Sequence, residues 1–271
     1  MKKIKIHYTY YIISISFILT GEFLNLLIFT SLIIIHELGH YLACLLVKIN
    51  VKKIIIYPYG GITKTEDIID IDFKSELLIS ISGIIMQFIY FLIINLLYKN
   101  YLIREYTYNL FYNYHYSMLI FNLIPIYPLD GSKILNAFLN VITTYKNSLS
   151  ITIIISYIFI IILSLLFFNL NKIIAFVIIF LMLEVNRLYK QRKELFNKFL
   201  LERYLNNFEF KKKKTIMSVN KMKKDYKHLF YIDGRYLTEN YFLKKMFDIR
   251  WILWYYFKRV GPHSTTTQRR F

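Results

Sequence analysis

The sequence lacks the features of a disulfide-stabilised chain. Its 271 residues include one cysteine, Cys44, so an internal disulfide is excluded and the redox compartment stays open. Cys44 lies in an apolar stretch, and we interpret it as a packing residue. The basic start MKKIKI is followed by an apolar stretch without a small-residue cleavage site. We therefore expect a first membrane anchor here rather than a cleavable signal peptide.

Acidic residues are scarce. The chain has 17 Asp and Glu against 35 Lys and Arg, a formal net charge of +18. From Arg187 onward there are 22 basic and 7 acidic residues, so most of the excess lies near the C-terminus. A basic tail can bind nucleic acid, but beside membrane spans it more often lies on a cytoplasmic face and contacts anionic lipid. We expect anionic lipid, and no nucleic acid, at this tail.

Hydrophobic residues make up 56% of the chain, in long runs separated by charged clusters. This pattern predicts an all-α polytopic membrane protein. Six spans can be drawn, at about 8–20, 23–47, 77–97, 110–126, 151–168 and 173–189. The segments expected outside hold few basic residues, whereas those expected inside hold many. The positive-inside rule therefore predicts that both termini are cytoplasmic.

One apolar run is interrupted by the polar motif HELGH, residues 36–40. On a helix, HExxH places the imidazoles of His36 and His40 on one face, with Glu37 beside a metal ion that they would share. Ionisable groups inside a span are costly and are functional candidates by default. The alternative is a His/Glu cluster that serves helix packing or proton conduction. The other histidines lack a paired spacing, and we expect them to be non-ligands: His7, His115, His228 and His263.

A catalytic zinc takes three protein ligands and keeps an open position, so one more ligand is needed. The best candidate is Asp130, in FNLIPIYPLDGSK. The second and fourth spans run in the same direction under the charge assignment, so both motifs reach the same end and can meet. Pro125 and Pro128 cannot continue a regular helix. We expect a broken backbone there, enclosed by protein or a water-filled cavity, although PLDG alone is also ordinary turn chemistry.

Together, HELGH and NLIPIYPLDG resemble the paired metal motifs of site-2 proteases, a family of zinc intramembrane metalloproteases. The stretches YPYGGITKTED, SGIIMQF and FLLERYLNN extend the resemblance to a sporulation branch that processes a membrane-associated sigma-factor precursor. It covers most of residues 7–207. The resemblance implies that one Zn²⁺ is held by His36, His40 and Asp130. It also implies that Glu37 is the catalytic general base, acting on zinc-activated water.

Three further residues are candidates for binding substrate. Asn122 matches the family's asparagine upstream of the aspartate, where it would hold substrate or polarise the carbonyl. Residues 52–65 alternate in polarity and contain Gly60 and Gly61, which suggests a hairpin. Its exposed edge could pair with an extended substrate by strand addition. A plain surface hairpin fits the pattern equally well.

The sequence departs from the resemblance in two places. Many relatives have Gly-Pro where this chain has Gly83-Ile84. The sporulation enzymes also carry a cytoplasmic CBS domain that senses adenine nucleotide, and HLFYIDGRYLTENYFLKKMF resembles only its second half. We therefore expect a small α/β, reduced CBS-like module. The predicted domains are a transmembrane metalloprotease domain at 1–190, a basic linker at 191–214, the module at 215–250 and a tail at 251–271.

The leading hypothesis is an intramembrane zinc endopeptidase with its active site toward the cytoplasmic side. Its substrate would be a membrane-associated sigma-factor precursor during sporulation, and its other partners inhibitory membrane proteins. Two alternatives stay open: cleavage of an anti-sigma factor or another membrane peptide, and a non-catalytic membrane-binding protein that retains the fold. A transporter would need further carriers along the spans, where only Glu22 and Glu184 are available, both near span ends.

Overall fold

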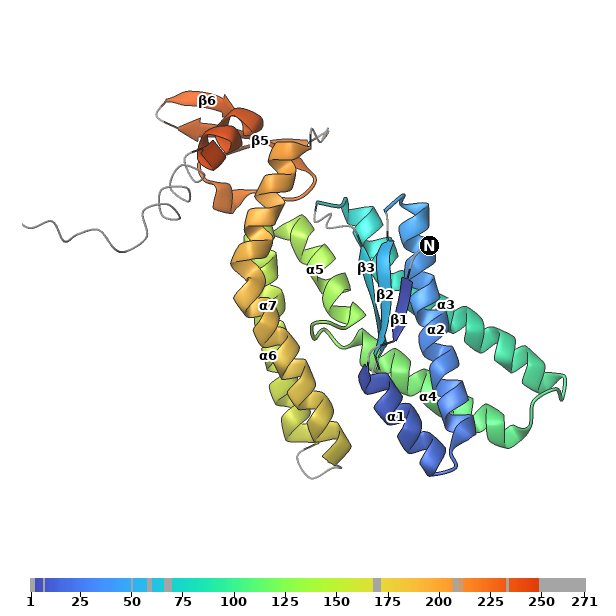
Figure 1. Ribbon diagram of the computed structural model, residues 1–271. Helices are drawn as coiled ribbons and strands as arrows, with labels where there is room; N and C mark the ends of the chain where they lie inside the picture. Colours follow the sequence, from blue (N-terminus) through green and yellow to red (C-terminus); the bar gives the residue numbers. More distant parts are fainter. Residues whose placement is uncertain are drawn as a thin grey trace, which may run out of the picture.

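Helices dominate the computed structural model of the protein (Figure 1). It describes residues 3–6, 8–49, 51–57, 60–65, 70–167, 172–206, 210, 212–232 and 234–248. Within these residues, seven α-helices and two three-stranded sheets are defined as complete elements. One sheet lies among the N-terminal helices, and the other lies beyond the end of the last long helix (Figure 1).

Three helices are long and apolar enough to cross a membrane. They are α2 (Phe23–Leu46), α3 (Phe73–Lys99) and α6 (Tyr145–Leu166). The other three predicted spans correspond to α1 (Tyr8–Leu19), α4 (Glu105–Leu123) and α7 (Lys172–Leu205). The 12 residues of α1 extend only about 18 Å, against about 30 Å of hydrocarbon core. The arrangement with six spans therefore stays a prediction.

The break predicted around Pro125 and Pro128 is confirmed. Helix α4 ends at Leu123, and α5 (Asp130–Ile142) begins two residues after the second proline. The intervening backbone is enclosed by protein, since Ile126 is fully buried and the Tyr127 amide donates to Oγ of Ser156 at 3.1 Å. Surrounding protein groups thus supply hydrogen-bond partners to backbone that cannot form helical hydrogen bonds.

The hairpin predicted at residues 52–65 is also confirmed. It consists of β2 (Val51–Tyr57) and β3 (Gly60–Thr65), which pair antiparallel. A further strand, β1 (Lys3–Ile6), was not predicted and pairs parallel with β2. The order β1-β2-β3 leaves β3 at one edge of the sheet (Figure 1). Strand β3 packs against α2.

The C-terminal module, residues 212–248, follows α7, which continues unbroken through the predicted boundary at 190 to Leu205. It contains β4 (Lys212–Ile216), the 3₁₀ turn η1 (Val219–Lys221), β5 (Tyr226–Ile232), β6 (Arg235–Thr238) and helical residues 239–248. Its strand order is β4-β5-β6. The expected strand–turn–strand–helix order is therefore present, whereas the assignment of the module to a CBS fold and the predicted domain boundaries stay proposals. The tail at 251–271 lies outside the described residues.

The C-terminal module is bonded to the ends of three helices of the N-terminal part. The Phe73 amide, at the start of α3, donates to Asp225, and the Tyr145 amide, at the start of α6, donates to the carbonyl of Met222. The Lys223 ammonium donates to the carbonyl of Ile142, at the end of α5, at 2.6 Å. These contacts place the starts of α3 and α6 and the end of α5 at one side of the molecule.

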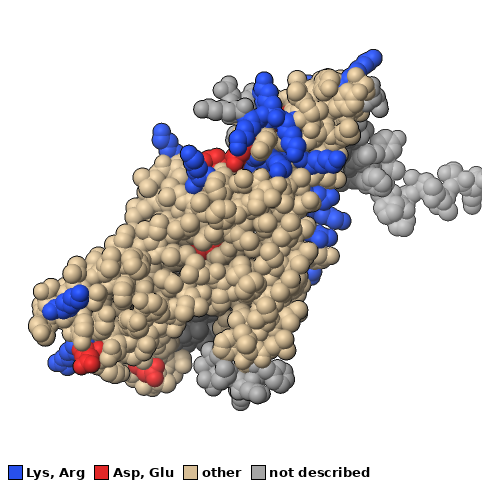
Figure 2. Space-filling view, turned by 180° about the vertical axis from the view of Figure 1, so that it is seen from behind, with Lys and Arg blue, Asp and Glu red and all other residues tan. Residues whose placement is uncertain are grey.

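The charged side chains are unevenly distributed over the surface. Lys and Arg side chains gather at the end where the C-terminal module lies, and the body between the two ends is almost free of charge (Figure 2). Exposed lysines on α7 and the module are Lys190, Lys193, Lys212, Lys213, Lys214, Lys221, Lys227, Lys244 and Lys245. An uncharged body with many exposed leucine, isoleucine and phenylalanine side chains is what lipid requires of a membrane protein.

Candidate metal centre

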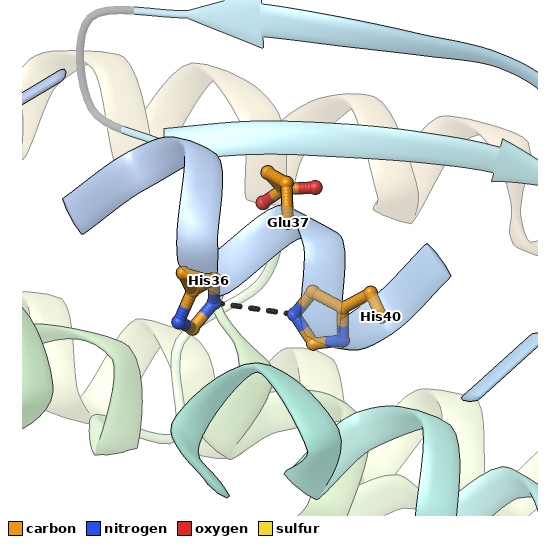
Figure 3. Close-up of side chains that lie close together, drawn as sticks. All are labelled: His36, Glu37 and His40. Carbon is orange, nitrogen blue, oxygen red and sulfur yellow. Dashed lines mark hydrogen bonds between the residues drawn. The ribbon is translucent and has the colours of Figure 1, made fainter. Parts of the chain in front are cut away.

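The HELGH motif forms part of α2, and all three of its ionisable side chains are buried. His36, Glu37 and His40 are 3%, 5% and 5% exposed. Because the two histidines are four residues apart, they lie on one face, with their Nε2 atoms 3.2 Å apart. Glu37 projects on another side of α2, toward the strands (Figure 3). The helix thus presents two imidazoles to one point and a carboxylate next to them.

Asp130, the first residue of α5, meets the two imidazoles. Its Oδ2 atom lies 2.9 Å from Nε2 of His36 and 3.0 Å from Nε2 of His40. A tetrahedral ion with bonds of about 2.0–2.1 Å would separate its ligand atoms by about 3.3 Å. The three observed separations, 2.9, 3.0 and 3.2 Å, are within a few tenths of an ångström of that value. Two imidazoles and one carboxylate are a donor set that suits zinc.

Glu37 is a second candidate for the third ligand. It can place a carboxylate oxygen within 4.8 Å of the ligand atoms of His36 and His40. Asp130 comes to within 3.0 Å of both imidazoles. The shorter distances favour Asp130 as the ligand, which leaves Glu37 adjacent to the ion, where it can exchange a proton with water.

The ring nitrogens away from this point differ in their surroundings. Nδ1 of His40 lies 2.7 Å from the carbonyl oxygen of Ile79 on α3. A carbonyl only accepts, so His40 carries its proton on Nδ1 and leaves Nε2 free to bind a metal. Among the described residues, Nδ1 of His36 is buried without a hydrogen-bond partner.

The other predicted residues take different positions. Asn122 is buried in the last turn of α4, 6% exposed. Gly60 and Gly61 begin β3, where they pair with Tyr57 and Ile56. They therefore lie at the turn end of the hairpin, on the strand that packs against α2.

Two histidines predicted to be non-ligands have neighbours other than the candidate centre. His115 packs flat on Phe91, and its carbonyl accepts from Gln87. The imidazole of His228 accepts from the amide of Lys223 in the C-terminal module, and its own amide donates to Glu239. His7 and His263 lie outside the described residues.

One residue at the centre was missed from the sequence. The ammonium of Lys133 lies 2.7 Å from Oδ1 of Asp130. The only available signal was the spacing of three residues in DGSK, which brings both side chains to one face of a helix.

The sequence matches known proteins over most of its length. Residues 24–118 and 99–166 match the profile of Peptidase family M50. Over 209 residues the chain is 31% identical to Stage IV sporulation protein FB of Bacillus subtilis (strain 168), covering 74% of this chain and 71% of that protein. The chain belongs to peptidase family M50. This M50 protein is a metalloendopeptidase and an integral membrane protein.

A solved structure shares the fold. The Site-2 Protease from Methanocaldococcus jannaschii superposes with a TM-score of 0.54 at 24% identity. The superposition covers 68% of this chain and 89% of that one. The resemblance to site-2 proteases inferred from HELGH and NLIPIYPLDG is thus confirmed at the level of family and fold.

Proposed function

We propose that the protein is an intramembrane zinc endopeptidase that cleaves a membrane-associated regulatory protein. The observation that carries the proposal is the convergence of His36, His40 and Asp130 from two helices, with Glu37 beside them. His36 and His40 would bind Zn²⁺ through Nε2, and Asp130 through Oδ2. When bound there, zinc supplies Lewis-acid chemistry and lowers the pKa of coordinated water.

Glu37 would act as the general base. Its carboxylate accepts a proton from the attacking water and then delivers that proton to the leaving amine of the cleaved peptide bond. Its burial, 5% exposed, keeps bulk water away from this transfer. Since the distances favour Asp130 as the third ligand, replacing Glu37 should stop turnover while the ligand set stays intact.

Strand β3 supports a way of holding substrate. It is an edge strand that packs against α2, the helix of the candidate centre, and Glu37 projects toward the strands (Figure 3). A helical substrate hides its backbone, so a scissile segment must arrive extended. We propose that such a segment adds to the edge of β3, with Gly60 and Gly61 at its turn end. Asn122 would hold the peptide or polarise its carbonyl.

The substrate class follows from the similarity to Stage IV sporulation protein FB. We propose a sigma-factor precursor processed during sporulation, with inhibitory membrane proteins as further partners. Both termini would be cytoplasmic, and the basic face of α7 and the C-terminal module would contact anionic lipid (Figure 2). An anti-sigma factor or another membrane peptide is the alternative substrate. A non-catalytic role is disfavoured because the base and all three candidate ligands are present together.

The test is cleavage of a co-expressed candidate precursor by the wild-type protein and by Glu37→Gln. We expect one shortened product of defined mass from the wild type, and none from Glu37→Gln at unchanged zinc content. A matched control is Glu184→Gln, on α7, because the Glu184 carboxylate forms an ion pair of 3.8 Å with Arg187. Cleavage by purified Glu37→Gln would overturn the assignment of the base.

A further inference from the structure

The two carboxylate oxygens of Asp130 have different partners. Oδ2 faces the imidazoles of His36 and His40, and Oδ1 accepts from the ammonium of Lys133 at 2.7 Å. The Asp130 side chain is 5% exposed, whereas that of Lys133 is 46% exposed. The lysine therefore reaches from a partly open position onto a carboxylate that the protein encloses.

The helix dipole does not favour a lysine at this position. Lys133 lies in the first turn of α5, where the helix dipole favours anions and disfavours cations. The Asp130 carboxylate does not cap the helix either, because the residue at the N-cap is Leu129 and no side-chain cap bond is made there. The contact of Lys133 with Asp130 is an i,i+3 ion pair, which contributes only about 0.2–0.5 kcal/mol to a helix. Its larger consequence is for the site, because the ammonium occupies one oxygen of an enclosed carboxylate.

A carboxylate can coordinate a metal ion through one oxygen or through both. A charge-assisted hydrogen bond to one oxygen holds it in place and competes with the ion for its lone pairs. Groups that bond to metal ligands in this way orient them and commonly change metal affinity or activity 10–100-fold when removed.

We propose that Lys133 is a positioning residue that reserves Oδ1 of Asp130, so that Asp130 offers only Oδ2 to the metal. This inference rests on the proposed metal site. One-oxygen binding leaves a coordination position for water, which the proposed hydrolysis requires. When Lys133 is lost, Oδ1 turns toward the ion and takes that position.

The test uses the full chain loaded with Co²⁺, whose visible absorption is strong in four-coordinate sites and weaker in five-coordinate ones. Lys133→Met removes the ammonium and keeps an unbranched side chain. We expect it to bind metal but to give a weaker, five-coordinate spectrum, with kcat reduced about 10–100-fold and KM unchanged. A wild-type spectrum from cobalt-loaded Lys133→Met would overturn the proposal.

Two further variants test the role of the hydrogen bond itself. Lys133→Arg and Lys133→Gln both keep a donor for Oδ1, so both should retain the four-coordinate spectrum. A five-coordinate spectrum in both would also overturn the proposal, and this comparison holds even if Lys133→Met fails to fold. Lys99→Met, an exposed position at the last residue of α3, is the matched control and should leave spectrum and turnover unchanged.

The same data separate this inference from the proposed function. If wild-type protein gives no cobalt spectrum that depends on His36, the metal site itself is wrong. If that spectrum is present and is the same in the wild type and in Lys133→Met, only the proposed role of Lys133 is wrong.

Discussion

A Cβ atom placed on Gly83 would lie 2.5 Å from Nε2 of His40. The same atom would lie 2.7 Å from Nε2 of His36. On the face of α2 that carries both histidines, α3 therefore approaches without a side chain, and only glycine fits there. Ile84 follows this glycine where the resemblance to site-2 proteases implies a proline, and α3 continues as a regular helix through both residues.

We predict that Gly83→Ala displaces the imidazoles and weakens zinc binding by at least about tenfold, since adding bulk to packed contacts typically costs about 1–3 kcal/mol. Competition with a chelator measures the affinity. Ile85→Ala, on the same helix but 47% exposed, is the control and should bind zinc as the wild type does. Equal affinity for Gly83→Ala and wild type would show that the close approach of α3 does not matter to the site.

The edge of β3 provides a second prediction. The backbone amides of successive residues in a strand point to opposite edges. The amides of Ile62 and Thr63 therefore differ: one points toward β2 and the other toward the open edge of β3. Proline at the outward position should keep zinc and lower kcat/KM about two- to tenfold, the effect of one lost hydrogen bond. Proline at the inward position should disturb the hairpin itself. Wild-type cleavage by both variants would contradict substrate pairing at this edge. Proline at Ile55 is less informative, because that residue pairs with both β1 and β3.

A third prediction concerns the attachment of the C-terminal module. Arg203, 2% exposed, donates to the carbonyls of Tyr226 and Lys223 at 2.8 and 3.1 Å and forms an ion pair with Asp70, just before α3. Arg203→Met leaves the Asp70 carboxylate buried without its cation, at a cost of about 3–5 kcal/mol. In detergent, we expect the variant to unfold at a lower temperature than the wild type. Limited proteolysis should separate the C-terminal module from the rest of the chain more quickly.

Arg187→Met controls for loss of an arginine on the same helix, because the Arg187 side chain is 65% exposed and an exposed ion pair contributes at most about 1 kcal/mol. Unchanged unfolding and proteolysis in Arg203→Met would mean that the module does not depend on this buried contact.

Local patterns in the sequence were sufficient to predict the parts of the site that depend on the spacing of residues along the chain. HExxH predicted two buried histidines on one helix face, and the prolines predicted the break before Asp130. That Asp130 could reach the histidines followed from the direction of the spans, which requires only the charge pattern. The side chains that surround these residues were not predictable, because the approach of Gly83 depends on how α3 packs.

Other features have no local signal. The four residues of β1, KIKI, are too short to separate from an irregular start by periodicity alone. The stretch after residue 190 reads as a basic linker, yet its apolar residues recur at helical spacing, and Phe196, Phe199 and Leu200 are buried in a core with the C-terminal module. The pairing of Arg203 with Asp70 joins residues 133 positions apart and is set by tertiary structure.

The most direct test of the account is the zinc content of purified protein. We predict about one zinc per chain in wild type and in Glu37→Gln, and a loss of at least about tenfold in zinc affinity for Asp130→Ala and for His36→Ala. Zinc bound by Asp130→Ala as tightly as by the wild type would contradict the central claim, because the carboxylate from α5 would then not be a ligand of the ion held by α2.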